Sequence, residues 1–121
     1  MQVVCVIDDE PAILKGVANL LKSAGYQTVC FESGARFLAS PWRVQAACVL
    51  LDLNMPDLLG TDVQRALRAQ HLTLPVICMS AQANPTQIDE ILALGAIQFL
   101  AKPFTAEALL NAIANSCRGA S

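Results

Sequence analysis

The chain has 121 residues; 55% of them are hydrophobic, 15% are charged, and the formal net charge is −2. This composition is typical of one compact domain with its own core, and it excludes a disordered chain. The mildly acidic balance excludes the basic surface that a nucleic-acid-binding domain usually carries. Neither an apolar run of ~20 residues nor a signal-peptide pattern is visible, so we expect a cytoplasmic protein that does not contact membranes.

Five short apolar runs alternate along the chain with segments of helical periodicity. The runs are rich in Val, Ile, Leu and Cys, and three of them are apolar almost throughout. This pattern predicts strands that are buried on both faces, as in a parallel sheet that helices cover on each side. The predicted strands comprise residues 2–7, 28–31, 47–51, 75–79 and 97–100.

The first predicted helix follows the first strand and has the clearest pattern. Pro11 suits a position near the helix start, and Gly25 suits a helix end. Between them, five apolar residues form one stripe with a 3.6-residue period. These residues are Ile13, Leu14, Val17, Leu20 and Leu21.

Four further helices follow in turn. A short helix fits residues 34–39, and a third fits 61–70 with Thr61 as its N-cap. The fourth begins with Asn84 as N-cap and Pro85 at the first helical position, and it ends at Gly95. The fifth begins at Thr105, and its buried face is predicted to comprise Leu109, Leu110, Ile113 and Cys117.

A strand followed by a helix, five times over, predicts a doubly wound α/β fold with right-handed crossovers. We expect a five-stranded parallel sheet, flavodoxin-like with strand order 2-1-3-4-5, and five helices. We also expect residues 1–121 to form a single domain, because no repeat, linker or low-complexity segment interrupts them.

The five cysteines are interpreted as reduced core residues. Their number is odd, no two have CxxC spacing, and most lie inside the apolar runs. These features disfavour both a disulfide framework and a metal site. The five are Cys5, Cys30, Cys48, Cys78 and Cys117.

Charged or polar side chains follow the predicted strands, and those after four of the five are candidates for one site; the second strand is followed only by Glu32 and Ser33. Asp8, Asp9 and Glu10 follow the first strand, and Asp52 follows the third. Ligands bind outside the carboxyl ends of the strands in open α/β sheets, so these residues are candidates for one site. Clustered carboxylates oppose one another's ionisation, so at least one raised pKa is expected without a cation. Two further candidates follow the fourth and fifth strands, namely Ser80 and Lys102.

Four motifs carry these residues in order along the chain: "VIDDEP", "LLDLNMPDLLG", "MSAQ" and "LAKPF". Together they resemble the receiver domain of two-component response regulators, over essentially the whole chain. In that family an aspartate at the end of the third strand accepts a phosphoryl group from a histidine kinase or a small phosphodonor, with Mg²⁺ required. The resemblance implies a switch that catalyses its own phosphorylation and dephosphorylation but is not an enzyme with a substrate to turn over.

By position, the resemblance assigns Asp52 as the phosphoacceptor. It implies that Asp9 and Asp52 bind Mg²⁺ directly, that Asp8 acts largely through metal-bound water, and that Asn54 supplies its backbone carbonyl. Mg²⁺ prefers oxygen ligands and is usually held by one or two carboxylates, which agrees with this set.

The resemblance also assigns residues to the phosphoryl oxygens. Lys102 supplies a positive charge and Ser80 a hydroxyl, with further contacts from Asn54 and from the backbone N–H of Ala81. The family usually has a cis peptide bond between this lysine and the following proline, which is Pro103 here.

Each residue also has a simpler interpretation. Acids at a helix start are favoured by the helix dipole, and this is the preferred interpretation of Glu10. Asp52 could be a turn residue, Lys102 a surface lysine and Ser80 ordinary loop chemistry. Phe99 stays open between two roles: a static, half-buried strand aromatic, or a switch residue that rotates inward when the Ser80 hydroxyl moves toward the phosphate.

Two other functions remain as alternatives. A Mg²⁺-dependent phosphohydrolase with an aspartate nucleophile usually needs a second carboxylate two residues later, where this chain has Asn54. A receiver-like module that binds partners without accepting phosphate is disfavoured because all four key positions are filled.

The expected partner is a histidine kinase or a phosphotransfer protein. The segments "LLKSAGYQTVCFESGARFL" and "GAIQFLAKPFTAEALLNAI" look most like receivers that precede helix-turn-helix DNA-binding output domains, which implies transcription regulation. These residues contain no output domain themselves, and nothing in them predicts direct contact with nucleic acid. The resemblance further implies that phosphorylation changes the surface of the fourth helix, fifth strand and fifth helix, and a phosphorylation-dependent homodimer is an open expectation.

Overall fold

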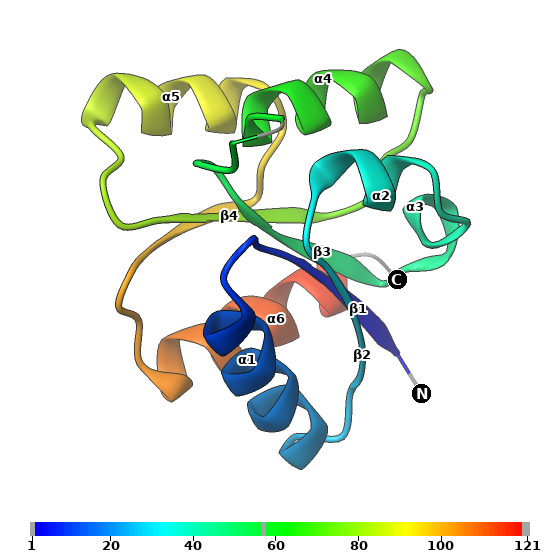
Figure 1. The fold of residues 1–121 in the computed structure, drawn as a ribbon, viewed down its shortest axis with the longest axis vertical. Coiled ribbons are helices and arrows are strands. Elements are labelled where there is room, and N and C mark those ends of the chain that lie inside the picture. The colour runs from blue at the N-terminus through cyan, green and yellow to red at the C-terminus, as the bar shows by residue number, and fades with distance from the viewer. Residues whose placement is uncertain (1, 57, 120–121) are drawn as a thin grey trace.

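The computed structural model describes residues 2–56 and 58–119. Its centre is a parallel sheet of five strands in the order β2-β1-β3-β4-β5 (Figure 1). The doubly wound, flavodoxin-like fold predicted from the sequence is thus confirmed. The strands are β1 (Val3–Ile7), β2 (Gln27–Phe31), β3 (Cys48–Asp52), β4 (Val76–Ser80) and β5 (Gln98–Ala101).

Helices cover both faces of this sheet. They are α1 (Pro11–Ser23), α2 (Gly34–Leu38), α3 (Trp42–Gln45), α4 (Gly60–Ala69), α5 (Pro85–Ala93) and α6 (Ala106–Gly119). Figure 1 shows α1 and α6 on one side of the sheet and the other four helices on the opposite side.

Successive strand residues enter two different cores, because side chains of a strand alternate between the faces of a sheet. Val6 and Leu50 belong to the core beneath α1 and α6, whereas Cys5 and Val49 belong to the core on the opposite face. All residues of β3 and β4 are buried. The continuous apolar runs in the sequence therefore reflect central strands that are covered on both sides.

Several helix ends follow their predicted signals. Gly25, just beyond α1, has a φ angle of 92°, in the left-handed region that favours glycine. The Asn84 side chain accepts the backbone N–H of Gln87 at 2.8 Å, and the Gln87 side chain accepts the backbone N–H of Asn84 at 3.0 Å. This reciprocal capping box starts α5. The Thr105 hydroxyl accepts the backbone N–H three residues further on, at the start of α6.

The predicted number of helices is wrong. Five were expected, whereas the described residues form six, because the single turn α3 follows α2. The Ser40 hydroxyl accepts the backbone N–H of Trp42 at 3.2 Å at the start of this turn. A helix of four residues is too short to show a periodic pattern of apolar residues.

Thr61 is also not the N-cap of α4. The helix begins at Gly60, after Leu59, which makes no side-chain capping bond. A Cβ atom at Gly60 would lie 2.7 Å from Leu53 Cδ2 and 3.1 Å from the carbonyl oxygen of Asp52. The start of this helix is therefore set by a close approach to the end of β3, which no local capping signal can show.

The remaining sequence predictions concern burial. The cysteines are free, and all are buried except Cys30, which is exposed. In α6, Leu109 and Ile113 are fully buried, whereas Leu110 is only partly buried against the same core.

None of the helices formed by residues 2–56 and 58–119 has the length and hydropathy to cross a bilayer.

Candidate functional site

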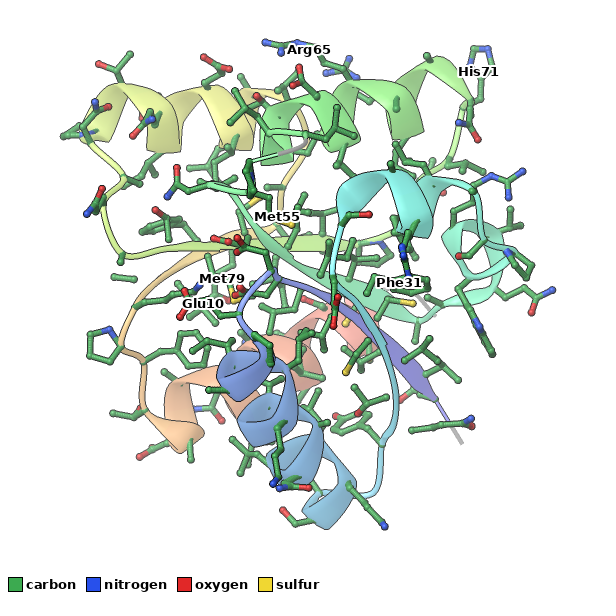
Figure 2. All side chains as sticks on the ribbon, in the orientation of Figure 1. Glu10, Phe31, Met55, Arg65, His71 and Met79 are labelled. Atoms are coloured by element: carbon green, nitrogen blue, oxygen red, sulfur yellow. The ribbon has the colours of Figure 1, made fainter. Side chains whose placement is uncertain are left out.

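The carboxyl ends of β1, β3, β4 and β5 meet at one edge of the sheet. Ile7 of β1 pairs with Leu51 of β3, and Asp52, the last residue of β3, pairs with Met79 of β4. Residues that end or follow these strands are therefore neighbours, although they are distant in the sequence. Figure 2 marks this edge by Glu10, where the chain turns from β1 into α1.

The first group at this edge is a cluster of carboxylates. Asp8, Asp9 and Asp52 each offer an oxygen atom, and these atoms lie within 4.8 Å of one another. Asp8 and Asp52 are buried, while Asp9 is exposed and leaves the cluster open to solvent. The ligand set consists of oxygen atoms only, which suits a hard divalent cation such as Mg²⁺ and not a soft metal.

Lys102 lies among these acids. Its Nζ atom is 2.7 Å from Asp8 Oδ2, 3.5 Å from Asp52 Oδ1 and 3.9 Å from Glu10 Oε1. The peptide bond between Lys102 and Pro103 is cis, and the backbone N–H of Lys102 donates to the carbonyl oxygen of Ser80. The ammonium is therefore one positive charge in a pocket of several negative charges.

The charges of the pocket shift the pKa of two groups. Burial raises the pKa of the Asp52 carboxyl, and the Asp8 carboxylate raises it further, although Lys102 partly offsets both effects. Burial by itself lowers the pKa of the Lys102 ammonium, but the hydrogen bond to Asp8 and the charge of Asp52 outweigh it, so this pKa is raised. Negative charge is thus in excess without a further cation.

Ser80, the last residue of β4, lies beside these acids and is buried. Its Oγ atom accepts a hydrogen bond of 2.6 Å from Asn54 Nδ2 and one of 3.1 Å from the backbone N–H of Gln82. Asn54 also donates its backbone N–H to Asp52 Oδ1 at 3.4 Å. The loop after β3 is therefore joined directly to the end of β4 at the site.

The other predicted residues lie around this centre. Ala81 is exposed directly after Ser80. Phe99 is partly buried in β5 and packs against the core beneath α2, α4 and α5, a position that suits both of the roles that the sequence left open. Glu10 precedes α1 at its N-cap position and is exposed, as expected of an acid at a helix start.

Sequence reasoning missed two features of this region and one elsewhere in the fold. It did not predict the ion pair of Glu10 with Lys102 or the bond between Asn54 and Ser80. It also missed Gln64, a buried amide on α4. The only signal for Gln64 was its place beside the apolar residues Val63 and Leu67 in a helix.

Comparison with known proteins gives a family for the chain. Residues 4–114 match the response regulator receiver domain. The chain is 35% identical over 111 residues to the response regulator protein TmoT of Ectopseudomonas mendocina, which covers 92% of this chain and 50% of that protein. It is 39% identical over 104 residues to the transcriptional regulatory protein KdpE of Mycobacterium tuberculosis, which covers 86% of this chain and 46% of that protein. The chain thus spans about half the length of these curated relatives.

A solved structure extends this likeness to three dimensions. The chemotaxis protein CheY4 of Vibrio cholerae superimposes with a TM-score of 0.88 at 29% sequence identity, over 96% of this chain and 98% of that chain. The sequence match and the fold therefore agree over most of the chain. On both grounds, this chain belongs to the receiver domains of two-component response regulators.

Proposed function

We propose that Asp52 is the phosphoacceptor of this receiver and takes a phosphoryl group from a histidine kinase, a phosphotransfer protein or a small phosphodonor. The observation that carries this proposal is the set of contacts around Asp52. Its carboxylate shares one pocket with the carboxylates of Asp8 and Asp9 and with the Lys102 ammonium. Burial raises the pKa of Asp52, and the neighbouring Asp8 carboxylate raises it further; a bound cation would relieve this repulsion between the two acids, which supports the proposal.

We propose that Mg²⁺ is the cofactor. Asp8, Asp9, Asp52 and the backbone carbonyl of Asn54 would hold it, and their oxygen atoms are ligands that this cation prefers. When bound, Mg²⁺ supplies positive charge that neutralises the acids and the oxygens of the phosphoryl group.

The chain's own residues perform the rest of the reaction. An Asp52 carboxylate oxygen attacks phosphorus, and the bond from phosphorus to the donor breaks with its electron pair leaving on the donor atom. Lys102 and the hydroxyl of Ser80 stabilise the charge on the phosphoryl oxygens, together with the backbone N–H of Ala81 and the amide of Asn54. The product is an aspartyl phosphate on the chain itself, which suits a signalling domain with no external substrate to turn over.

The added phosphate changes the pocket by almost two negative charges and three acceptor oxygens. We propose that the Ser80 hydroxyl moves toward it and that Phe99 of β5 responds, which alters the surface of α5, β5 and α6. Such a ligand shifts the equilibrium only by its different affinity for the two states. A phosphorylation-dependent homodimer and control of an output domain in a longer regulator, including a DNA-binding one, are proposed readouts of this surface.

The test is covalent labelling with radioactive acetyl phosphate and Mg²⁺. The wild-type chain is expected to take up about one hydroxylamine-sensitive phosphoryl group per molecule. Asp52→Asn is expected to take up none, because the amide is not a nucleophile. Asp89→Asn is a matched control, since Asp89 is an exposed acid on α5. Labelling of Asp52→Asn at the wild-type level would refute the proposal, as would many turnovers of the donor without a labelled chain.

A further inference from the structure

A cleft of about 850 Å³ lies at the amino edge of the sheet, where the strands begin. The segments that lead into β3, β4 and β5 form most of its wall. The carboxylate pocket is at the opposite edge, and Figure 2 shows His71, which lines the cleft, on the side of the molecule away from Glu10. The cleft is therefore separate from the site described above.

The cleft has exposed apolar walls. Val44 on α3 is 62% exposed and Ile97 is 49% exposed, and both residues line it. Val44 precedes β3 and Ile97 precedes β5, so the two stand on either side of the start of β4. Leu72 and Leu74, which are partly buried, continue this surface between them. Exposed apolar side chains around a concave surface are typical of a place that a partner covers.

Arg43 gives the cleft a fixed positive charge. Its Nε donates to Gln70 Oε1 at 3.1 Å, and its Nη1 donates to the carbonyl oxygen of Ser40 at 2.8 Å. These bonds orient the guanidinium, which has five N–H donors in a planar fork. Three of the five have no partner among residues 2–56 and 58–119. A planar fork with free donors suits a carboxylate, which can accept two parallel bonds.

The amino edge carries no charge that would oppose a carboxylate. The loops at this edge, with the helix ends that lead into them, contain basic residues but neither Asp nor Glu. These segments are residues 22–27, 39–47, 68–75 and 92–98. An acidic ligand therefore meets Arg43 without like charges nearby, whereas the carboxyl edge of the sheet would repel it.

His71 gives a second reason to regard the cleft as functional. It follows the end of α4 with a φ angle of 58°, in the left-handed region that favours glycine. The backbone N–H groups of His71 and Leu72 close the helix by donating to the carbonyl oxygens of Arg68 and Leu67. Glycine would make the same closure without strain, so local folding does not account for a histidine here.

We infer that this cleft docks an acidic segment of a partner protein, with a carboxylate bound by Arg43 and an adjacent apolar side chain packed against Val44 and Ile97. Charge complementarity selects the acidic segment, and the apolar walls select a polypeptide. Nucleic acid fits poorly, because Arg43 is the single Lys or Arg among the described residues that line the cleft. The docking does not depend on the proposed reaction of Asp52.

The experiment is a titration of the ¹⁵N-labelled chain with a short peptide of alternating Glu and Leu that is capped at both ends. The backbone resonances of residues 43–47, 71–75 and 95–97 are expected to shift, with a dissociation constant below about 1 mM. The resonances of Asp8, Asp9 and Lys102 are expected to stay in place. The same peptide with Gln instead of Glu is expected to bind about tenfold more weakly, because it lacks the charge that Arg43 recognises.

Two variants test the two parts of the cleft. Arg43→Gln is expected to weaken binding of the acidic peptide by about tenfold, and Val44→Ser by about threefold. Arg36→Gln is the matched control, since Arg36 is an exposed arginine of α2 that does not line the cleft, and it should change the affinity by less than about twofold. The same spectra show whether each variant is folded.

Four results would overturn the inference. The first is that the cleft resonances do not move at about 5 mM acidic peptide. The second is that the neutral peptide binds as tightly as the acidic one, and the third is that Arg43→Gln and Val44→Ser both bind like the wild type. The fourth is that the cleft resonances shift on simple concentration of the chain, or with a single-stranded oligonucleotide at lower concentration than with the peptide, which would assign the cleft to a second copy or to nucleic acid.

Discussion

The ionised Asp52 carboxylate lowers the free energy of unfolding when no metal is bound. Its pKa is raised because it is buried and faces Asp8. As the pH rises from the ordinary carboxyl value of 3.8, the unfolded chain releases this proton before the folded chain does. The free energy of unfolding therefore falls through that window and stays lower above it. We expect Asp52→Asn to raise the melting temperature at pH 7 in EDTA by about 4 °C, which corresponds to roughly 1 kcal/mol in a domain of this size.

Thermal unfolding followed by circular dichroism checks this expectation, with Asp89→Asn as the control. The gain of Asp52→Asn should shrink as the pH is lowered toward 3.8 and vanish well below it, because Asp52 is then protonated in both states. It should also shrink when Mg²⁺ is added, since the wild type gains more from the cation than the variant does. No gain at pH 7 in EDTA would mean that Lys102 already balances the charge of Asp52.

Among the charged residues of the pocket, Lys102 is expected to make the largest electrostatic contribution to the free energy of unfolding. Its side chain is 11% exposed and pairs with the fully buried side chain of Asp8 at 2.7 Å. Removing one partner of such a pair costs roughly 3–5 kcal/mol, because the other charge stays buried and unpaired. We expect Lys102→Met to lower the free energy of unfolding by about 3 kcal/mol in EDTA, and by clearly less in saturating Mg²⁺.

Urea denaturation of Lys102→Met measures both values, and Lys15→Met is a matched control. Lys15 is an exposed lysine of α1, so its substitution should change the free energy of unfolding by less than about 0.5 kcal/mol. An equal loss in EDTA and in Mg²⁺ would show that Lys102 stabilises the fold through its aliphatic stem and not through its charge.

The residues that meet at the pocket could be predicted from the sequence because each of them ends or follows a strand, and the strand order decides which strand ends are neighbours. Once β1, β3, β4 and β5 are parallel neighbours, Asp8, Asp52, Ser80 and Lys102 must share one edge. The contacts between them were not predictable in the same way. The bond from Asn54 to Ser80 depends on the side-chain rotamers of a loop residue and of the last residue of β4, and residue spacing carries no information about those.

At the scale of the elements, Gln64 links α4 to α5 by a hydrogen bond but also buries a polar atom that lowers stability. Its Nε2 donates to the carbonyl oxygen of Ile91 at 3.0 Å, but its Oε1 is buried without a partner among the described residues. The Ile91 carbonyl also accepts the backbone N–H of Ala96, so it keeps a partner when Gln64 is replaced. Replacing Gln64 by an apolar side chain of similar size therefore leaves no buried polar group without a partner and removes the penalty of the unpartnered oxygen. We expect Gln64→Leu to raise the free energy of unfolding by about 1 kcal/mol.

Gln64→Glu is the paired variant, because it keeps the shape of the side chain but introduces a charge that is costly to bury. It should lower the melting temperature, whereas Gln64→Leu should raise it in the same thermal unfolding experiment. A loss of stability in Gln64→Leu would mean that the bond between α4 and the Ile91 carbonyl outweighs the unpartnered oxygen.

Helix boundaries show where local sequence suffices and where it does not. Asn84 was predicted correctly as a cap because its capping box uses bonds within four residues of the chain. Thr61 was predicted wrongly because α4 begins where Gly60 packs closely against Leu53, and this contact depends on how α4 packs against the end of β3. The single turn α3 was not predicted for a third reason: it is too short to show a helical periodicity of apolar residues.

The whole molecule is organised around one sheet with two cores. Neighbouring residues of the same strand, such as Val49 and Leu50, belong to opposite cores. Neither core can lose its packing without exposing strands that the other needs, so the two layers are expected to unfold together. The fold could be predicted at this scale because a strand that is buried on both sides has to be apolar throughout, and β3 and β4 are.

Because both cores share one sheet, Mg²⁺ bound at the pocket is predicted to stabilise parts of the molecule that do not contact it. Trp42 is the single tryptophan of the chain and packs on α3 against the core opposite α1 and α6. Mg²⁺ at one hundred times its dissociation constant should stabilise the folded chain by about 2.7 kcal/mol, or roughly 10 °C in melting temperature. Because unfolding is cooperative, Trp42 fluorescence and circular dichroism at 222 nm should give coincident transitions, and Mg²⁺ should shift both equally. A fluorescence transition that stays in place while the dichroism transition moves would show that the two layers unfold separately.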